Sequence, residues 1–168
     1  LETILEGHYR PGHFQGVCMV VQRLLEIVKP DNLFIGQKDY QQCMVIKKLV
    51  QIIGKADEIN IRIAQTVRED GGLALSSRNL RLSENEKKKA LNLYKELTFI
   101  KNNINKTPVK ELKNVAANRL QKAGFTIDYV EVANSETLEP SVNTEEHLVA
   151  LIAATLGKVR LIDNMILN

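Results

Sequence analysis

The sequence has 168 residues, of which 44% are hydrophobic and 26% charged, and a net charge of +3. These values are ordinary for a soluble globular protein of one domain or two small ones. No apolar run reaches the roughly 18 residues that cross a bilayer. The basic run Lys87–Lys89 lacks the aromatic or arginine cluster typical of a nucleic-acid surface, so a solvated helix face is the preferred interpretation.

In chain order, the first half is predicted to fold as helix, strand, helix, strand. Apolar residues at helical spacing predict a helix from about His13 to Val28, which Pro30 ends. The short apolar run Asn32–Ile35, ending at Gly36, predicts a buried strand. The next two elements are a helix over Tyr40–Ile53 and a strand over the alternating Ile59, Ile61 and Ile63. This order is typical of a parallel α/β sheet.

The second half begins with a polar stretch rich in glycine and serine, Val67–Asn79, which predicts a loop. Ser83 is followed three residues later by Glu86, a capping box, so a helix is expected from there to about Asn103. The markers of another helix are a cap at Thr107, a first-turn proline at Pro108 and an end at Gly124.

The strands expected to follow are Tyr129–Val132, Leu148–Leu156 and Val159–Leu167. Gly157-Lys158 is short enough to be a hairpin turn between the last two. The fold class is therefore α/β, with a boundary near Gln65. Residues 1–65 form the first part, and residues 66–168 form a small α+β domain.

The first part is incomplete as a domain, because two strands and two helices cannot close a doubly wound sheet. It is either an addition to the second domain or the end of a domain whose earlier strands are missing. The start at Leu1 favours the second explanation.

Cys18 and Cys43 lie inside apolar helical patterns. They are interpreted as small core residues of a reduced, cytoplasmic protein. No Cys/His spacing resembles a metal site, so no metal ligands are predicted.

The first candidate site is Gly36–Gln42, which follows a predicted strand and opens a helix. In open α/β sheets, ligands bind at the carboxyl ends of strands, and helix N-termini receive phosphates. Lys38 would add a positive charge, and Gly36 would allow a close backbone approach. The alternative is a plain strand-to-helix turn with Asp39 as the helix cap.

The second candidate is Leu75–Asn79, after the flexible Asp70-Gly71-Gly72. Two hydroxyls and a guanidinium in a mobile loop suit an anionic ligand. The alternative is a polar linker between domains.

The third candidate is Arg10–Phe14, where Arg10 could hold a carboxylate and His13 stands at a helix start. The alternative is a helix entry with a capping residue.

Together, these segments resemble the pantoate–β-alanine ligase (pantothenate synthetase) family. Its motifs occur in the same order and approximate spacing as Arg10–Phe14, Gly36–Gln42, Leu73–Asn79 and Leu161–Asn164. Gln37 departs from the pattern, because the family usually has glutamate there. The stretch from Gly36 to Leu75 is a little longer than common.

The resemblance implies an AMP-forming ligase that joins pantoate to β-alanine. Pantoate attacks the α-phosphorus of ATP to give pantoyl adenylate and pyrophosphate, and the amine of β-alanine then displaces AMP. Adenylation supplies the leaving group that a carboxylate lacks, so the protein's task is positioning and charge stabilisation.

The resemblance also implies roles for individual residues. The expected ATP contacts are Gly36, Gln37, Lys38, Asp39, Val67, Leu75, Ser76, Ser77 and Arg78. Lys38, Ser76, Ser77 and Arg78 among them are expected to act in catalysis. Gln42, Arg10 and His13 are expected to bind pantoate, and Gln41 is expected to be an ordinary surface residue.

The implied fold is the tail of a Rossmann-like nucleotidyltransferase domain followed by a small α+β C-terminal lid domain, in a cytoplasmic homodimer. The family's His-x-Gly-His motif does not occur in the chain. That motif and the ligands for Mg²⁺ are expected upstream, so the chain is expected to be partial and inactive alone. No nucleic acid or membrane is expected as a partner.

Two other interpretations stay open. One is another nucleotidyltransferase of the same superfamily, against which Gln42 and the Arg10–Phe14 string count. The other is an isolated, non-catalytic C-terminal binding domain.

Overall fold

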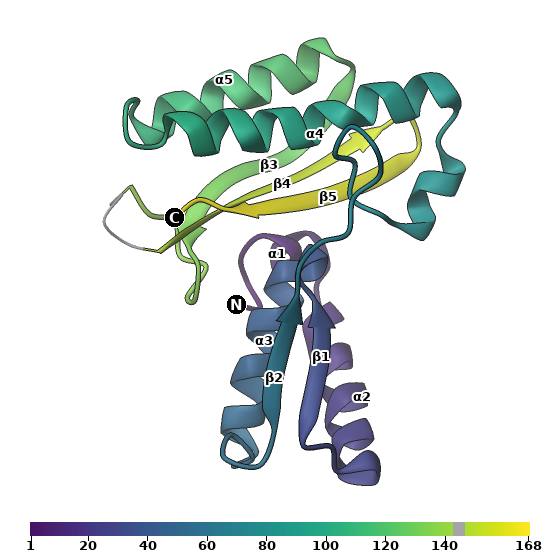
Figure 1. Cartoon of the computed structure of the whole chain (residues 1–168), viewed down its shortest axis with the longest axis vertical. Coiled ribbons are helices and arrows are strands. Elements are labelled where there is room, and N and C mark those ends of the chain that lie inside the picture. The colour runs from purple at the N-terminus through teal and green to yellow at the C-terminus, as the bar shows by residue number, and fades with distance from the viewer. Residues whose placement is uncertain (143–146) are drawn as a thin grey trace. The chain divides into compact units, whose positions relative to one another are not determined.

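The structure is a computed structural model that describes residues 1–142 and 147–168. It divides into two compact units, Leu1–Gln65 and Thr66–Asn168, and each is described by itself (Figure 1).

The first unit consists of a small parallel sheet with helices packed on one face. Its elements are α1 (Glu6–Tyr9), α2 (His13–Val28), β1 (Asn32–Gly36), the 3-10 turn η1 (Gln37–Asp39), α3 (Tyr40–Ile52) and β2 (Asn60–Ala64). β1 and β2 pair in parallel, from Asn32 opposite Asn60 to Gly36 opposite Ala64. The predicted order of helix, strand, helix, strand is confirmed. The prediction that β1 is a buried strand was wrong, because its alternate residues are exposed, and the short α1 was not predicted.

Only one face of this sheet is covered. Leu33, Ile35 and Ile61 pack against a core that contains Leu25 of α2 and Ile46 of α3. Alternate strand residues point to opposite faces, and the other face exposes Phe34, which is 73% accessible. α2 also exposes apolar side chains, namely Met19, Val20, Leu24 and Ile27. The unit therefore buries one side of a sheet, as expected for so few elements.

The second unit packs two long helices on an antiparallel sheet. Its elements are η2 (Ser77–Arg81), α4 (Glu84–Asn103), α5 (Val109–Lys122), β3 (Phe125–Asn134), β4 (Leu148–Leu156) and β5 (Val159–Ile166). The sheet has the strand order β3-β4-β5. The predicted hairpin between the last two strands is confirmed, with Leu156 paired to Val159.

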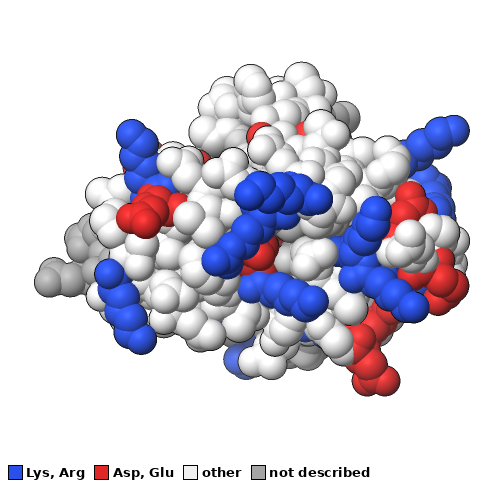
Figure 2. Space-filling view, turned by 90° about the horizontal axis from the view of Figure 1, so that it is seen from above, with Lys and Arg blue, Asp and Glu red and all other residues white. Residues whose placement is uncertain are grey.

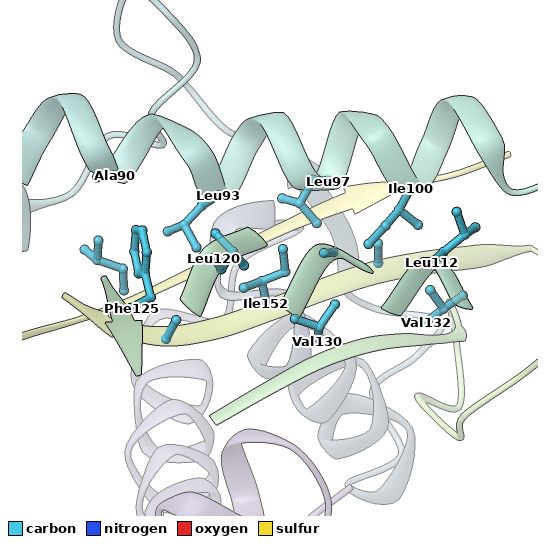
Figure 3. Close-up of a cluster of buried hydrophobic side chains, with 14 of the residues drawn as sticks. Ala90, Leu93, Leu97, Ile100, Leu112, Leu120, Phe125, Val130, Val132 and Ile152 are labelled. Carbon is cyan, nitrogen blue, oxygen red and sulfur yellow. The ribbon is translucent and has the colours of Figure 1, made fainter. Parts of the chain in front are cut away.

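The core of the second unit lies between its helices and its sheet. α4 contributes Leu93, Leu97 and Ile100, which point toward Ile152 of the central strand (Figure 3). These residues recur at helical spacing, so one face of α4 is apolar and the opposite face is free to carry charge.

Two boundaries in this unit differ from the prediction. α5 begins at Val109, and Pro108 rather than Thr107 is its N-cap, without a side-chain hydrogen bond. The Pro108 carbonyl accepts the first helical bonds, from the N–H groups of Glu111 and Leu112. β3 is longer than predicted, because Phe125–Ile127 and Ala133–Asn134 also pair with β4. The register shifts at Asp128, whose carboxylate accepts a 2.7 Å hydrogen bond from Arg160.

The two cysteines differ in how deeply they are buried. Cys43 is fully buried, as predicted, and burial raises the pKa of its thiol to about 11. Cys18 is only partly buried on α2, so its placement in the core was wrong.

The surface over α4 and α5 carries basic side chains interspersed with acidic and uncharged ones (Figure 2). Lys87 of the predicted basic run pairs with Glu84, with an N–O distance of 2.8 Å. Over the residues that the structure describes, no helix is both long and apolar enough to cross a membrane.

Candidate functional site

The turn from β1 into α3 carries the first candidate group. Gly36 has an extended backbone, and η1 then turns the chain into the helix. The Cys43 thiol donates to the Gly36 carbonyl at 3.3 Å, which fastens the turn to α3. Asp39 is the N-cap residue of α3 but makes no side-chain cap hydrogen bond, so the alternative role as a helix cap is wrong. Its exposed carboxylate is available to a ligand.

The neighbouring glutamines of α3 have different environments. Gln41 is 3% accessible, so its expected surface position was wrong. Its Oε1 accepts from the Glu6 N–H at 2.9 Å, and its Nε2 donates to the carbonyls of Leu1 at 2.6 Å and Ile4 at 2.9 Å. Gln42 is half-buried, and among the described residues its amide has no hydrogen-bond partner.

Gln41 therefore has a structural function that was not predicted from the sequence. It fastens the segment before Arg10 to the first turn of α3, across 35 to 40 residues of chain. A signal was present, because Gln41 shares a helix face with the buried Val45 and Leu49 at spacings of four residues.

Arg10 and His13 meet at the start of α2. The Arg10 guanidinium donates from Nη1 to His13 Nε2 at 2.9 Å. Because arginine can only donate, the imidazole is neutral, with its proton on Nδ1. Burial and then the Arg10 charge lower the pKa of His13, while the carboxylates of Glu6 and Asp39 act in the opposite direction. Arg10, His13 and Asp39 thus share one electrostatic environment in the first unit.

In the second unit, Val67–Leu75 forms a hairpin. The candidate segment Leu75–Asn79 continues from it into a turn that contains Ser76 and Ser77, called the serine turn below. Arg68 and Ala74 form an antiparallel bridge, and the Leu75 N–H donates to the Val67 carbonyl at 2.9 Å. Val67 and Leu75 are 66% and 50% accessible, so both stand on the outward side of the hairpin. Among the described residues the Val67 N–H has no partner, which leaves a donor beside an acceptor carbonyl.

The serine turn opens on a hollow of about 450 Å³. Its lining includes Glu69, Leu75, Ser76, Ser77, Asn79 and Lys87. Ser76 Oγ accepts from the Arg78 N–H at 3.2 Å and caps η2. Asn79 is 4% accessible and donates to Ala74 and Glu69, which joins the turn to the hairpin. Its Oδ1 is buried without a partner among the described residues.

Arg68 anchors the hairpin and was missed in the sequence. Its guanidinium makes a two-point ion pair with Asp163 of β5, with N–O distances of 2.7 and 3.0 Å. It also donates to the carbonyls of Gly72 and Asn164, and it lies 4.5 Å from the ring centroid of Tyr94. The signal was Asp163 itself, the one acid of β5, since a buried carboxylate requires a cation.

The model of the pantoate–β-alanine ligase family matches residues 1–166. The chain belongs to this family. The chain is 42% identical over 170 residues to the pantothenate synthetase of Fervidobacterium nodosum, covering 100% of the chain and 60% of that protein. It is 44% identical over 169 residues to the one from Clostridioides difficile, covering 98% of the chain and 58% of that protein.

Solved structures of this family have the same fold. A pantothenate synthetase from Thermus thermophilus matches with a TM-score of 0.92 and 36% identity, over 99% of this chain and 60% of that one. A pantoate–β-alanine ligase from Francisella tularensis, complexed with β,γ-ATP and β-alanine, matches with a TM-score of 0.75 and 34% identity, over 98% of this chain and 54% of that one. The chain spans about 60% of the length of the relatives that it matches and corresponds to their C-terminal part.

Proposed function

We propose that the chain carries the ATP-binding loops and the pantoate-binding residues of an AMP-forming pantoate–β-alanine ligase. The carrying observation is that a buried side chain holds each motif segment: Gln41 at the segment before Arg10, Cys43 at the turn from Gly36, and Asn79 at the turn after Leu75. Polar groups of these segments stay accessible to solvent, which is where a ligand could bind. Membership of the family and the complex of a relative with β,γ-ATP and β-alanine support the substrates.

The proposed reaction has two steps. A carboxylate oxygen of pantoate attacks the α-phosphorus of ATP, and the bond from that phosphorus to the bridging oxygen breaks, which releases pyrophosphate. The amine of β-alanine then attacks the acyl carbon of pantoyl adenylate, the bond to the AMP oxygen breaks, and the amine loses a proton to water. Both steps depend on orientation and on donors aimed at developing negative charge.

The proposed ATP contacts come from each unit. In the first unit they are Gly36, Gln37, Lys38 and Asp39, and in the second unit Val67, Leu75, Ser76, Ser77 and Arg78. The Val67 N–H and carbonyl offer a donor and an acceptor, which is what one edge of adenine requires. Cations and hydroxyls suit the phosphates, and Lys38, Ser76, Ser77 and Arg78 are proposed to stabilise the charge that grows as pyrophosphate leaves.

The proposed pantoate contacts are Gln42, Arg10 and His13. A glutamine amide can donate to a carboxylate and accept from a hydroxyl, and pantoate carries both groups. The Arg10 guanidinium suits the carboxylate, and the neutral His13 leaves its Nδ1–H as a further donor.

Magnesium is proposed to enter with ATP. Among the described residues, no group of three or more His, Cys, Asp or Glu side chains could hold a metal ion. From the resemblance, the ligands are proposed to lie in the part of the relatives that the chain does not span. The Rossmann-like character of the first unit, a homodimer and a cytoplasmic location belong to the same proposal, and they rest on the resemblance.

A composite enzyme tests the proposal, with the chain in place of the matching 60% of the Fervidobacterium nodosum protein. It should form pantothenate, AMP and pyrophosphate in equal amounts from pantoate, β-alanine and ATP. Release of ADP, or a folded composite that consumes no ATP, would contradict the proposal.

The chain by itself should bind ATP without forming pantothenate, because its sequence has no His-x-Gly-His motif. Pantothenate formation by the chain alone, at the rate of the composite, would show that this motif is dispensable.

A further inference from the structure

The Arg68 side chain connects the hairpin Val67–Leu75 to β5, while the buried Leu73 of the hairpin packs into the core of the unit. The hairpin's own hydrogen bonds, from Glu69 N–H to Leu73 at 2.8 Å and from Gly72 N–H to Glu69 at 2.9 Å, fix its turn. These bonds lie within the hairpin and do not attach it to the sheet. The Arg68 guanidinium does so, because it joins the Gly72 carbonyl to Asp163 of β5.

The surroundings of Arg68 leave little freedom. The side chain of Asp163 is only 3% accessible, and that of Arg68 is 19% accessible. Gly72 has a positive φ of 104°, and a Cβ there would lie 2.0 Å from the Tyr94 ring, so the turn sits directly against α4. The same Tyr94 ring stacks on the guanidinium. A planar group with several fixed donors suits this position, whereas lysine offers a single compact charge.

The orientation of Arg68 also sets the orientation of its neighbours. Side chains alternate along an extended strand, so an inward Arg68 requires an outward Val67. The bridge to Ala74 extends the same constraint to Leu75, and Asn79 extends it to the serine turn. The residues of this unit that are proposed to contact ATP are thus positioned by Arg68, which is not itself a proposed ATP contact.

We propose that Arg68, held by Asp163, is a positioning residue that keeps the Val67–Leu75 hairpin in its nucleotide-binding conformation. This inference rests on the proposed function for its link to ATP. Without the anchor the hairpin would occupy its competent conformation for only part of the time. If that fraction falls to about 0.1, the apparent dissociation constant for ATP rises about tenfold.

The experiment uses the chain with Arg68→Lys, which keeps the charge, and with Asp163→Asn, which keeps the shape. In the absence of ligand, amide hydrogen exchange at Gly72 and Leu75 should accelerate in both variants, while exchange in the α4 core stays slow. The ATP dissociation constant should rise about tenfold, while binding of pantoate, whose proposed contacts lie in the first unit, should not change.

Arg119→Lys is the matched control. Arg119 also stacks on a ring, Phe99, at 4.2 Å and approaches the carboxylate of Glu96 at 3.5 Å, but it belongs to α5. This substitution should leave hairpin exchange and ATP binding unchanged.

Several outcomes would overturn the inference. Unchanged exchange at Gly72 and Leu75 in both variants would show that Arg68 does not anchor the hairpin. Faster exchange throughout the unit, with ATP and pantoate binding lost together, would indicate a purely structural role. Faster amide exchange in the hairpin with an unchanged dissociation constant for ATP would show that the position of the hairpin does not affect ATP binding. If the unsubstituted chain binds no ATP, the ATP part of the proposed function fails, and the exchange data alone decide whether the anchor exists.

Discussion

The Arg68 guanidinium and the Asp163 carboxylate, 95 residues apart in the chain, form a two-point ion pair with N–O distances of 2.7 and 3.0 Å. The pair lies almost out of solvent and connects the hairpin to β5. The geometry of this ion pair affects the free energy of unfolding as well as the position of the Val67–Leu75 hairpin.

Asp163→Leu should destabilise the chain by about 3–5 kcal/mol, because it leaves a buried guanidinium without its counter-charge. The double variant Arg68→Met with Asp163→Leu should cost less than Asp163→Leu alone, since no charge then stays buried. Urea unfolding followed by circular dichroism measures both. A double variant as unstable as the sum of its single variants would mean that the two side chains do not interact.

Gln42→Ala should raise the Michaelis constant for pantoate in the composite enzyme far more than the constant for ATP. Unpaired buried ligand groups cost about 1–3 kcal/mol, which corresponds to roughly a five- to 150-fold effect. Gln51→Ala, at an exposed position of the same helix, is the matched control. Equal effects of the two substitutions would exclude Gln42 from the pantoate site.

Gln41→Ala should act on folding instead. It leaves the Glu6 N–H and the carbonyls of Leu1 and Ile4 without their partner. A loss of about 1–3 kcal/mol is expected. Normal stability together with a raised pantoate constant would reverse the roles assigned to the two glutamines.

His13 should titrate below the ordinary histidine value of 6.5, because burial and Arg10 disfavour its cation. A group with a lowered folded pKa contributes stability that is present above the unfolded value and is lost as pH falls through the folded value. The first unit should therefore lose stability as pH falls below about 6.5.

Two variants check the cause by NMR titration of His13. Arg10→Gln should raise the pKa of His13, and Asp39→Asn should lower it further, since these side chains act in opposite directions. Shifts in the same direction would show that the imidazole does not sense both groups.

Ser83→Ala should destabilise α4 by about 0.5–2 kcal/mol. Ser83 Oγ accepts from the Glu86 N–H at 3.3 Å, and the Glu86 carboxylate accepts from the Ser83 N–H at 2.8 Å, which confirms the predicted capping box. The dissociation constant for ATP should not change. A variant with normal unfolding and lost ATP binding would contradict a role limited to the cap.

The elements were predictable where local signals decide them. The bounds of α2 at His13–Val28 and of β4 at Leu148–Leu156 match the prediction, because helical spacing and a long apolar run leave little ambiguity. The start of β3 at Phe125 was missed because Asp128 interrupts the apolar pattern there, and pairing with β4 outweighs this local signal.

The candidate loops were predictable as motifs but not as structures. Sequence spacing identifies Gly36–Gln42 and Leu75–Asn79, but it cannot show that Asp39 leaves α3 uncapped or that Arg68 reaches β5. Contacts between residues so far apart in the chain follow from tertiary packing rather than from local pattern. The single buried acid of β5 was the available signal.

The most direct test of the account is the ATP kinetics of Lys38→Ala and Ser77→Ala in the composite enzyme, because each removes one proposed phosphate contact from a different unit. Loss of such a donor should lower the rate of pyrophosphate release roughly 10²–10³-fold. Lys47→Ala, an exposed lysine on α3, is the control and should leave the rate unchanged. Rates equal to that of the unsubstituted composite in both Lys38→Ala and Ser77→Ala would contradict the assignment of these loops to ATP.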